Sequence, residues 1–72
     1  MKVLTITNSI NSKVELITCK TIEEAIEKMK SLYQRKCSEI KFDIYNTYLD
    51  EDERYAQVVD GLEQTEYRIG NI

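Results

Sequence analysis

The sequence has no histidine, no proline and only two glycines. Histidine is the usual general acid or base near neutral pH, so its absence removes the commonest proton-transfer catalyst and a frequent zinc ligand. Two glycines cannot form a glycine-rich loop around a phosphate, which excludes the common nucleotide-hydrolysing sites. We therefore predict that the protein is not an enzyme and has no catalytic residue, no cofactor and no metal.

Long hydrophobic runs are also missing. The first ten residues, MKVLTITNSI, lack the run of seven or more apolar residues that a signal peptide needs. No stretch approaches the ~20 apolar residues of a membrane-spanning helix. These absences predict a cytoplasmic protein without a membrane partner.

Cysteine is scarce, and its two copies are predicted to stay reduced. Cys19 and Cys37 fall at the two ends of a predicted helix, where about 16 residues at ~1.5 Å rise hold them ~24 Å apart, beyond the reach of a disulfide. Cys37 follows two basic residues, but the C-terminal end of a helix raises the pKa of a thiol. Cys19 precedes the helix without any known catalytic signature. We expect both to be structural thiols.

Charge is uneven along the chain, although the net charge is only −3. Residues 1–36 carry seven basic and four acidic groups, whereas residues 37–72 carry three basic and nine acidic groups. The second half would repel a phosphate backbone, so we predict no direct binding of nucleic acid. The basic groups late in residues 21–36 suit the C-terminal end of a helix dipole and are interleaved with acidic ones.

A chain of 72 residues makes one small domain, predicted to span 1–72. Its 42% hydrophobic and 32% charged residues are typical of a globular protein. A domain of this size buries only about 60% of the surface that its unfolded chain exposes. Burial against a partner or a second copy would therefore help to stabilise it.

The first half contains a predicted hairpin and a predicted helix. Residues 2–7 (KVLTIT) and 13–19 (KVELITC) are β-branched runs with partial alternation, separated by turn-forming residues. Residues 21–36 repeat apolar side chains at three- and four-residue spacing, and Thr21 with Glu24 forms a capping box at their start. We predict a β-hairpin followed by an amphipathic helix.

Three strands are predicted in the second half of the chain. Residues 39–48 (EIKFDIYNTY) alternate apolar and polar side chains, as in a strand with one buried face. Residues 54–59 (RYAQVV) and 62–69 (LEQTEYRI) flank Asp60 and Gly61, a dipeptide typical of a type I′ hairpin turn. The sequence therefore predicts a strand followed by a second hairpin.

A two-residue turn at 60–61 also predicts which side chains lie opposite each other. On one surface we expect the pairs Val59 with Leu62, Gln57 with Gln64, and Tyr55 with Glu66. On the other surface we expect Val58 with Glu63, Ala56 with Thr65, and Arg54 with Tyr67. A β-bulge would reverse these surfaces, and that alternative stays open.

The predicted fold is a two-layer α+β domain of order ββαβββ, in which one amphipathic helix packs on an antiparallel sheet. Each predicted element contributes its apolar side chains to one shared core. The predicted core residues are Leu4, Ile6, Val14, Leu16, Ile22, Ile26, Met29, Leu32, Phe42, Ile44, Val58, Tyr67 and Ile69.

Four consecutive carboxylates, Asp50 to Glu53, form the densest charge feature of the chain. A calcium loop starting at Asp50 would need an oxygen ligand at its fifth position, glycine at its sixth and glutamate at its twelfth. Those positions hold Arg54, Tyr55 and Gly61, so the run does not fit a calcium loop. Its place between two predicted strands indicates a solvated hairpin tip that discourages edge-to-edge aggregation.

A surface for a protein partner is the first functional hypothesis. One helix covers only one face of a sheet, so if Val58 faces the helix, Tyr55 and Val59 face solvent. Such an apolar and aromatic patch with charged neighbours has the composition of a binding surface for a partner protein or a second copy. The predicted partner-binding residues are Tyr45, Tyr55, Val59, Leu62 and Glu66. Scattered exposed apolar residues are also normal on soluble proteins, and that interpretation stays open.

An acidic inhibitor is the second hypothesis. A short chain without histidine or proline and rich in Ile, Lys, Glu and Tyr resembles, in composition, the small proteins of low-GC bacterial phages and mobile elements. That resemblance implies an anti-defence role, anti-CRISPR-like, in which carboxylates mimic nucleic acid and block a DNA- or RNA-binding enzyme. The acidic residues in question are Asp43, Asp50, Glu51, Asp52, Glu53, Asp60 and Glu63, together with Glu66. Such binding weakens steeply with salt, whereas binding through the sheet face does not.

Overall fold

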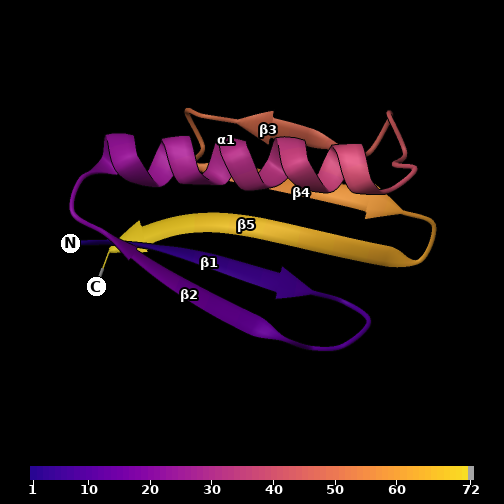
Figure 1. The fold of residues 1–72 in the computed structure, drawn as a ribbon, viewed down its shortest axis with the longest axis horizontal. Helices are drawn as coiled ribbons and strands as arrows, with labels where there is room; N and C mark the ends of the chain where they lie inside the picture. Colours follow the sequence, from indigo (N-terminus) through magenta and orange to yellow (C-terminus); the bar gives the residue numbers. More distant parts are fainter. Residues whose placement is uncertain (72) are drawn as a thin grey trace.

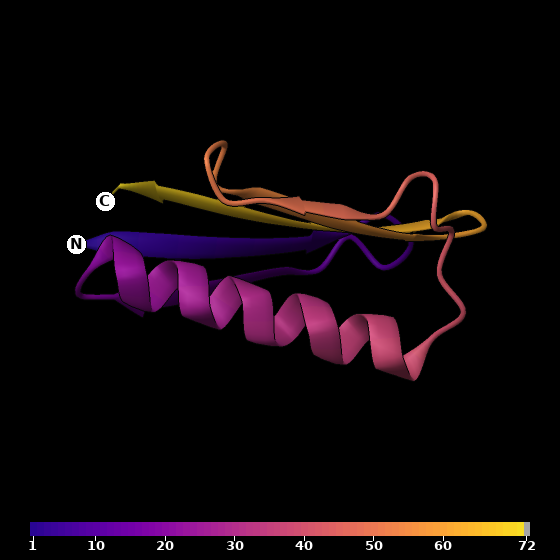
Figure 2. The same cartoon turned by 90° about the horizontal axis from the view of Figure 1, so that it is seen from above.

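The computed structural model, which describes residues 1–71, has one helix lying across one face of a five-stranded antiparallel sheet (Figures 1 and 2). The elements in chain order are β1 (Lys2–Asn8), β2 (Val14–Cys19), α1 (Ile22–Glu39), β3 (Tyr48–Asp50), β4 (Tyr55–Asp60) and β5 (Glu63–Asn71). This is the order ββαβββ in two layers, so the predicted fold class is confirmed.

The strands follow the order β2-β1-β5-β4-β3 across the sheet, and every neighbouring pair is antiparallel. The first and last strands of the chain are therefore partners, with Leu4 opposite Ile69, and the two termini lie at the same end of the molecule (Figure 1). This long-range pair joins the N-terminal hairpin to the C-terminal one. β2 and β3 are left as the two edges of the sheet.

The helix begins where the capping box predicts. The hydroxyl of Thr21 accepts a hydrogen bond from the Glu24 amide at 3.2 Å, and the Glu24 carboxylate accepts one from the Lys20 amide at 3.0 Å. These bonds satisfy amides that have no partner inside the helix. The helix runs to Glu39, three residues beyond its predicted end, and an ion pair between Arg35 and Glu39 supports its last turn.

The core lies between the helix and the sheet. Leu4, Met29 and Val58 are the largest fully buried side chains, and Ala56 and Tyr67 complete the central cluster. Leu4, Val58 and Tyr67 belong to three adjacent strands, and Met29 comes from the middle of the helix. Removing this apolar surface from water is the main stabilising contribution to such a fold.

The predicted strand over 39–48 is wrong. Only Tyr48–Asp50 forms a strand there, while residues 40–47 form a loop that contains a turn at 44–46. The Asp43 carboxylate closes this turn by accepting hydrogen bonds from the Tyr45 amide and the Asn46 side chain. An aspartate that bonds the backbone two residues ahead stabilises a turn, and this local bond outweighs the alternating pattern.

The loop also removes two residues from the predicted core. The side chain of Ile44 is 72% exposed, and Phe42 is exposed as well. The loop instead attaches to the edge of β4 through its backbone, because the Asp43 amide donates to the Val59 carbonyl at 2.7 Å. The alternation of 39–48 therefore does not correspond to a buried face.

Val14 and Leu16, both predicted in the core, are exposed, and Leu16 retains 66% of its accessible surface. Residues of β2 alternate between the two faces of the sheet, and Ile17 and Cys19 are the ones that face the helix. The segment VELITC has apolar residues in both phases, so its sequence pattern does not decide which pair is buried.

The β4–β5 hairpin differs from its predicted register by two residues. Val59 lies opposite Gln64 instead of Leu62, and Tyr55 lies opposite Arg68 instead of Glu66. The turn is formed by residues 61–62, with positive φ at Gly61 alone, as in a type II′ turn. Because a shift of two residues keeps each strand residue on its predicted side, the predicted faces of the two strands are correct, although Leu62 falls in the turn.

Candidate protein-binding surface

The face of the sheet opposite the helix carries no covering element within the described chain (Figure 2). Strand alternation and the observed register determine which side chains lie on it. We call this the open face; its residues are Val14, Leu16 and Thr18 of β2, Val3, Thr5 and Thr7 of β1, Gln64, Glu66 and Arg68 of β5, Tyr55, Gln57 and Val59 of β4, and Tyr48 and Asp50 of β3. Apolar side chains thus lie along its β2 side and tyrosines along its β3–β4 side, with a polar strip between them.

The tyrosine side of the open face is a cluster of interacting rings and charges. The ring centroids of Tyr48 and Tyr55 are 5.8 Å apart and their planes are tilted by 48°. The Arg68 guanidinium lies over the Tyr55 ring, 4.8 Å from its centroid, and pairs with the Glu66 carboxylate at 3.0 Å. A cation over an aromatic face is attracted by the ring quadrupole, so Tyr55 and Arg68 hold each other in place.

Hydrogen bonds fix the orientation of Tyr55. Its hydroxyl donates to the Gln57 side-chain carbonyl at 2.7 Å, and the Gln57 amide donates to the Asn46 carbonyl at 2.6 Å. Burial raises the pKa of Tyr55 above its ordinary value, and the nearby Glu66 charge adds to the rise. The side chain therefore remains a neutral phenol at physiological pH.

A shallow hollow of about 420 Å³ lies at this side of the open face. Its lining residues are Tyr48, Asp50, Glu53, Tyr55 and Arg68. Tyr48 contributes much of the exposed aromatic surface, because 48% of it remains accessible. The hollow combines two aromatic rings with two carboxylates.

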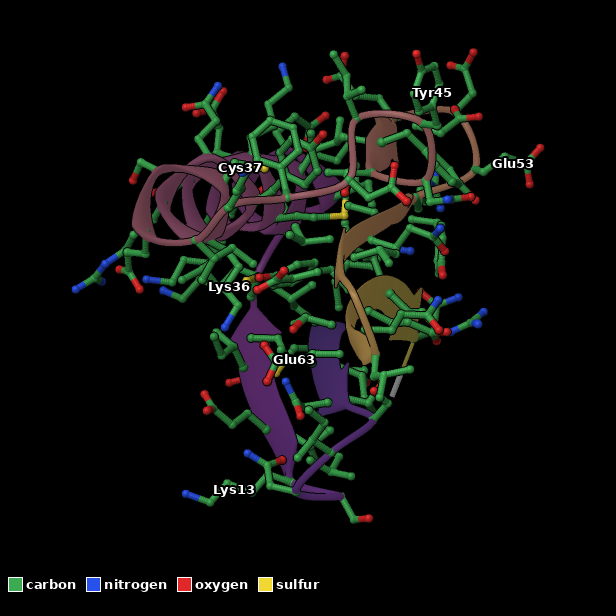
Figure 3. The ribbon with its side chains drawn as sticks, turned by 90° about the vertical axis from the view of Figure 1, so that its right-hand side faces the viewer. Lys13, Lys36, Cys37, Tyr45, Glu53 and Glu63 are labelled. Atoms are coloured by element: carbon green, nitrogen blue, oxygen red, sulfur yellow. The ribbon has the colours of Figure 1, made fainter. Side chains whose placement is uncertain are left out.

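The five predicted partner-binding residues are only partly brought together. Tyr55, Val59 and Glu66 lie on the open face, on two adjacent strands. Tyr45 is 93% exposed but belongs to the turn at 44–46, at the top of Figure 3, and Leu62 is 96% exposed in the β4–β5 turn. These two side chains therefore lie off the open face.

Several residues of the open face were not predicted from the sequence. Tyr48 completes the aromatic cluster, and Val14 and Leu16 form the apolar β2 side, whereas Arg68 was expected among the charged neighbours of the patch. Tyr48 was hidden by the wrong strand assignment for 39–48. The sequence also allowed the observed position of Leu16, because Ile17 and Cys19 are apolar too and could face the core in its place.

The predicted acidic surface is divided between distant parts of the molecule. The run Asp50–Glu53 lies at the β3–β4 tip, toward the end that holds the termini, whereas Asp60 and Glu63 lie at the opposite end (Figure 1). Asp60 and Glu63 also lie on the helix side of the sheet, and Asp43 belongs to the loop before β3. The seven carboxylates therefore do not form one continuous surface.

Two of these carboxylates pair with lysines of the helix. Glu51 lies 2.9 Å from the ammonium of Lys30, and Glu63 lies 3.6 Å from that of Lys36. Figure 3 shows Lys36 and Glu63 pointing toward each other between the helix and the sheet. Part of the acidic second half is thus neutralised by the basic first half.

The acidic run itself forms the predicted hairpin tip. A carboxylate oxygen of Asp50 accepts hydrogen bonds from the amides of Asp52 and Glu53, at 3.0 and 3.2 Å, which closes the turn. Arg54 follows with a positive φ of 56°. No three acidic or thiol side chains of residues 1–71 are grouped so that they could hold a metal ion.

The cysteines occupy structural positions. Cys19 is buried at the end of β2, and Cys37 is half-buried inside the last turns of the helix, not beyond its end as predicted. Burial raises the pKa of the Cys37 thiol, and a hydrogen bond with Tyr33 offsets part of that rise. A thiol held in its neutral form is a poor nucleophile at physiological pH.

A second hollow, of about 430 Å³, lies between the C-terminal half of the helix and the N-terminal hairpin. Its apolar lining comes from Ile6, Leu32 and Tyr67. The charged residues at its rim largely neutralise one another, since Arg35 pairs with Glu39 and Lys36 with Glu63. Lys13 and Glu15 also line it, and neither forms an ion pair among the described residues.

The open face offers aromatic rings, aliphatic side chains, hydroxyls, amides and the charged groups of Asp50, Glu66 and Arg68. The helix within residues 1–71 is not apolar enough over its length to span a lipid bilayer. Comparison with known proteins gives no matching protein family, curated sequence or solved structure.

Proposed function

We propose that this chain is a small non-catalytic interaction domain whose open face binds a partner protein or a second copy of itself. The observation that carries the proposal is the uncovered cluster of Tyr48, Tyr55 and Arg68 on the sheet. Tyrosine and arginine are enriched among residues that contribute most to protein–protein binding, because they bury large areas and still make polar contacts.

The setting of the cluster supports the same proposal. Tyr55 is oriented by its bond to Gln57 and by Arg68, so little side-chain entropy is lost when a partner covers it. Polar side chains, including Thr5 and Thr7, extend the face toward the apolar side chains of β2. Non-obligate interfaces likewise combine apolar and aromatic contacts with polar ones.

We also propose that the domain acts in the cytoplasm. Both cysteines are free, as expected in a compartment that keeps thiols reduced. The experiment for location is fluorescence microscopy of a tagged chain in its native cell, and secretion of the tagged chain would contradict the proposal.

The binding proposal is tested with a double variant of the open face, Tyr55→Ser with Val59→Thr. Affinity capture from an extract of the native cell, together with sedimentation equilibrium of the purified chain, measures partner binding and self-association. We expect the double variant to lose both kinds of association while its circular dichroism stays unchanged. Gln34→Ser, on an exposed position of the helix, is the matched control and should retain them.

The acidic-inhibitor hypothesis has weaker support, because its carboxylates lie on different faces and two of them pair with lysines. The same capture experiment, repeated at low and high salt, separates the two hypotheses. Binding through the open face should change little with salt, whereas nucleic-acid mimicry should be lost steeply. Steep loss combined with full binding by the double variant would reject the open-face proposal.

A further inference from the structure

We propose that the hollow lined by Tyr48, Asp50, Glu53, Tyr55 and Arg68 receives a further cationic side chain, arginine or lysine, from the partner protein, over the ring of Tyr48. This inference rests on the proposed function and names the chemistry of the partner.

The rings provide the first part of a cation site. The ring centroids of Tyr48 and Tyr55 lie 5.8 Å apart with a tilt of 48°, and the half-exposed Tyr48 ring can be covered by a guanidinium or an ammonium group. Arg68 already occupies a position over Tyr55, which demonstrates that this ring accepts a guanidinium in the folded chain. Within residues 1–71, no cation occupies the corresponding position over Tyr48, which is half exposed.

The carboxylates provide the second part. The Asp50 carboxylate is fixed by the hydrogen bonds that it accepts from two backbone amides. Glu53 points outward from the side of the sheet opposite the helix (Figure 3). Among the described residues neither carboxylate pairs with a basic side chain, in contrast to Glu51 and Glu63.

Arg68 does not neutralise this rim, because its guanidinium is paired with Glu66. Asp52 lies on the same hairpin tip, forms no ion pair among the described residues and adds to its negative potential, whereas Glu51 is paired with Lys30. A positively charged side chain is therefore attracted by the rim and then covered by the rings, and a neutral one is not. This charge complementarity favours a basic segment of a partner protein over an apolar one.

The test is a titration of the ¹⁵N-labelled chain, followed by NMR, with the peptide acetyl-Gly-Arg-Gly-Arg-Gly-amide. Its matched control replaces both arginines by citrulline, which keeps the shape of the side chain but removes its charge. We expect saturable shifts at the amides of Tyr48, Glu53 and Tyr55 with the arginine peptide, with affinity on the order of millimolar for so few contacts. A lysine peptide should shift the same amides, and a norleucine peptide should not.

Variants locate the site. Tyr48→Leu and Glu53→Gln should each weaken binding of the arginine peptide by about two- to fivefold, as expected for one exposed cation–aromatic contact or one exposed ion pair. Asp60→Asn removes the same charge at the opposite end of the molecule and should leave the affinity unchanged. Equal shifts with the citrulline peptide, or equal weakening by Asp60→Asn and Glu53→Gln, would overturn the inference.

The capture experiment distinguishes this inference from the proposed function. If Tyr48→Leu and Glu53→Gln capture the partner as well as the unchanged chain does, while the double variant Tyr55→Ser with Val59→Thr does not, the cation site is rejected and the interaction domain stands. If the double variant still captures the partner, the proposed function itself fails.

Discussion

Lys30 in the middle of the helix and Glu51 at the tip of the β3–β4 hairpin form an ion pair, with 2.9 Å between Nζ and Oε1. The two residues are separated by the helix end, the loop 40–47 and strand β3, so the contact exists only in the folded chain. It holds the hairpin tip, and with it the rim of the open-face hollow, against the helical layer.

This pair predicts a pH-dependent stability. The hydrogen bond and charge of Glu51 raise the pKa of Lys30 above its ordinary value. The folded state therefore holds this proton more tightly than the unfolded state, so the stabilisation is full at neutral pH and is lost as the pH rises through the folded pKa. We expect Glu51→Gln to lower the urea midpoint slightly at neutral pH and not at strongly alkaline pH.

Asp52→Asn is the matched control for Glu51→Gln, because it removes a charge from the same tip without breaking an ion pair. Added salt should narrow the difference between Glu51→Gln and the unchanged chain, since exposed charges are screened. If Asp52→Asn lowers the urea midpoint as much as Glu51→Gln does, the change in net charge is responsible and not the pair with Lys30.

Substitutions in the core should lower the stability of the fold much more than substitutions at exposed positions. Met29 is fully buried against Leu4 and Val58, so Met29→Ala should lower the free energy of unfolding by about 2–5 kcal/mol. Ile44→Ala and Leu62→Ala remove comparable side chains from exposed positions and should change it by less than ~0.5 kcal/mol. Chemical denaturation of the three variants measures these changes. A large loss of stability in Ile44→Ala would indicate that Ile44 is buried, as the strand predicted for 39–48 requires.

Tyr67 should control unfolding at high pH. Burial, with added negative charge from Cys37, Glu39 and Glu15, raises the pKa of Tyr67 to about 12. A raised pKa means that the folded state prefers the neutral phenol, so stability is complete below the ordinary tyrosine value near 10 and is lost as the pH approaches 12. Spectrophotometric titration should show Tyr67 ionising together with unfolding.

Tyr67→Phe should reduce this alkaline loss of stability, because no phenol remains to be ionised at that position. Tyr45→Phe removes a hydroxyl from a fully accessible turn and serves as the control, which should leave the alkaline transition unchanged. The midpoint of alkaline unfolding, followed by circular dichroism, measures both variants. An unchanged midpoint in Tyr67→Phe would contradict the role of this side chain.

The β2 edge should determine how the chain aggregates. β2 is six residues long, borders no further strand in the described chain, and exposes Leu16 on the open face, whereas the opposite edge strand β3 has only three residues. A long edge with exposed apolar side chains is a template for pairing with another chain. We expect Leu16→Lys to reduce light scattering on heating while the unfolding midpoint changes little.

Leu62→Lys introduces the same charge at an equally accessible leucine that lies in a turn instead of an edge strand. It should reduce aggregation less than Leu16→Lys does. Equal protection by the two variants would indicate a general effect of charge, because the edge strand would then have no special role.

Local sequence signals gave correct predictions wherever the relevant bonds are local. The capping box of Thr21 and Glu24 locates the helix start to the residue, because the bonds join groups only a few positions apart. The hairpin tip at Asp50–Glu53 follows from its charges and from turn chemistry in the same way. In the β4–β5 hairpin, the two faces were predicted correctly although the register was not.

The errors arose where two patterns were equally compatible with the residues. The segment VELITC has apolar side chains on both faces of its strand. Only pairing with β1 placed Ile17 and Cys19 toward the helix. Residues 39–48 alternate like a strand, yet the Asp43 turn and the continued helix left only Tyr48–Asp50 to pair with β4.

Composition and periodicity determined the helix, the ββαβββ order and the two faces of the β4–β5 hairpin, because those depend on contacts between near neighbours along the chain. Tertiary structure decided which faces are covered and which residues meet across the sheet. The cluster of Tyr48, Tyr55 and Arg68 comes from three strands, and its members become neighbours only when long-range pairing sets the register. One helix can cover a single face of a five-stranded sheet, and that geometric limit is the reason that an aromatic surface remains uncovered.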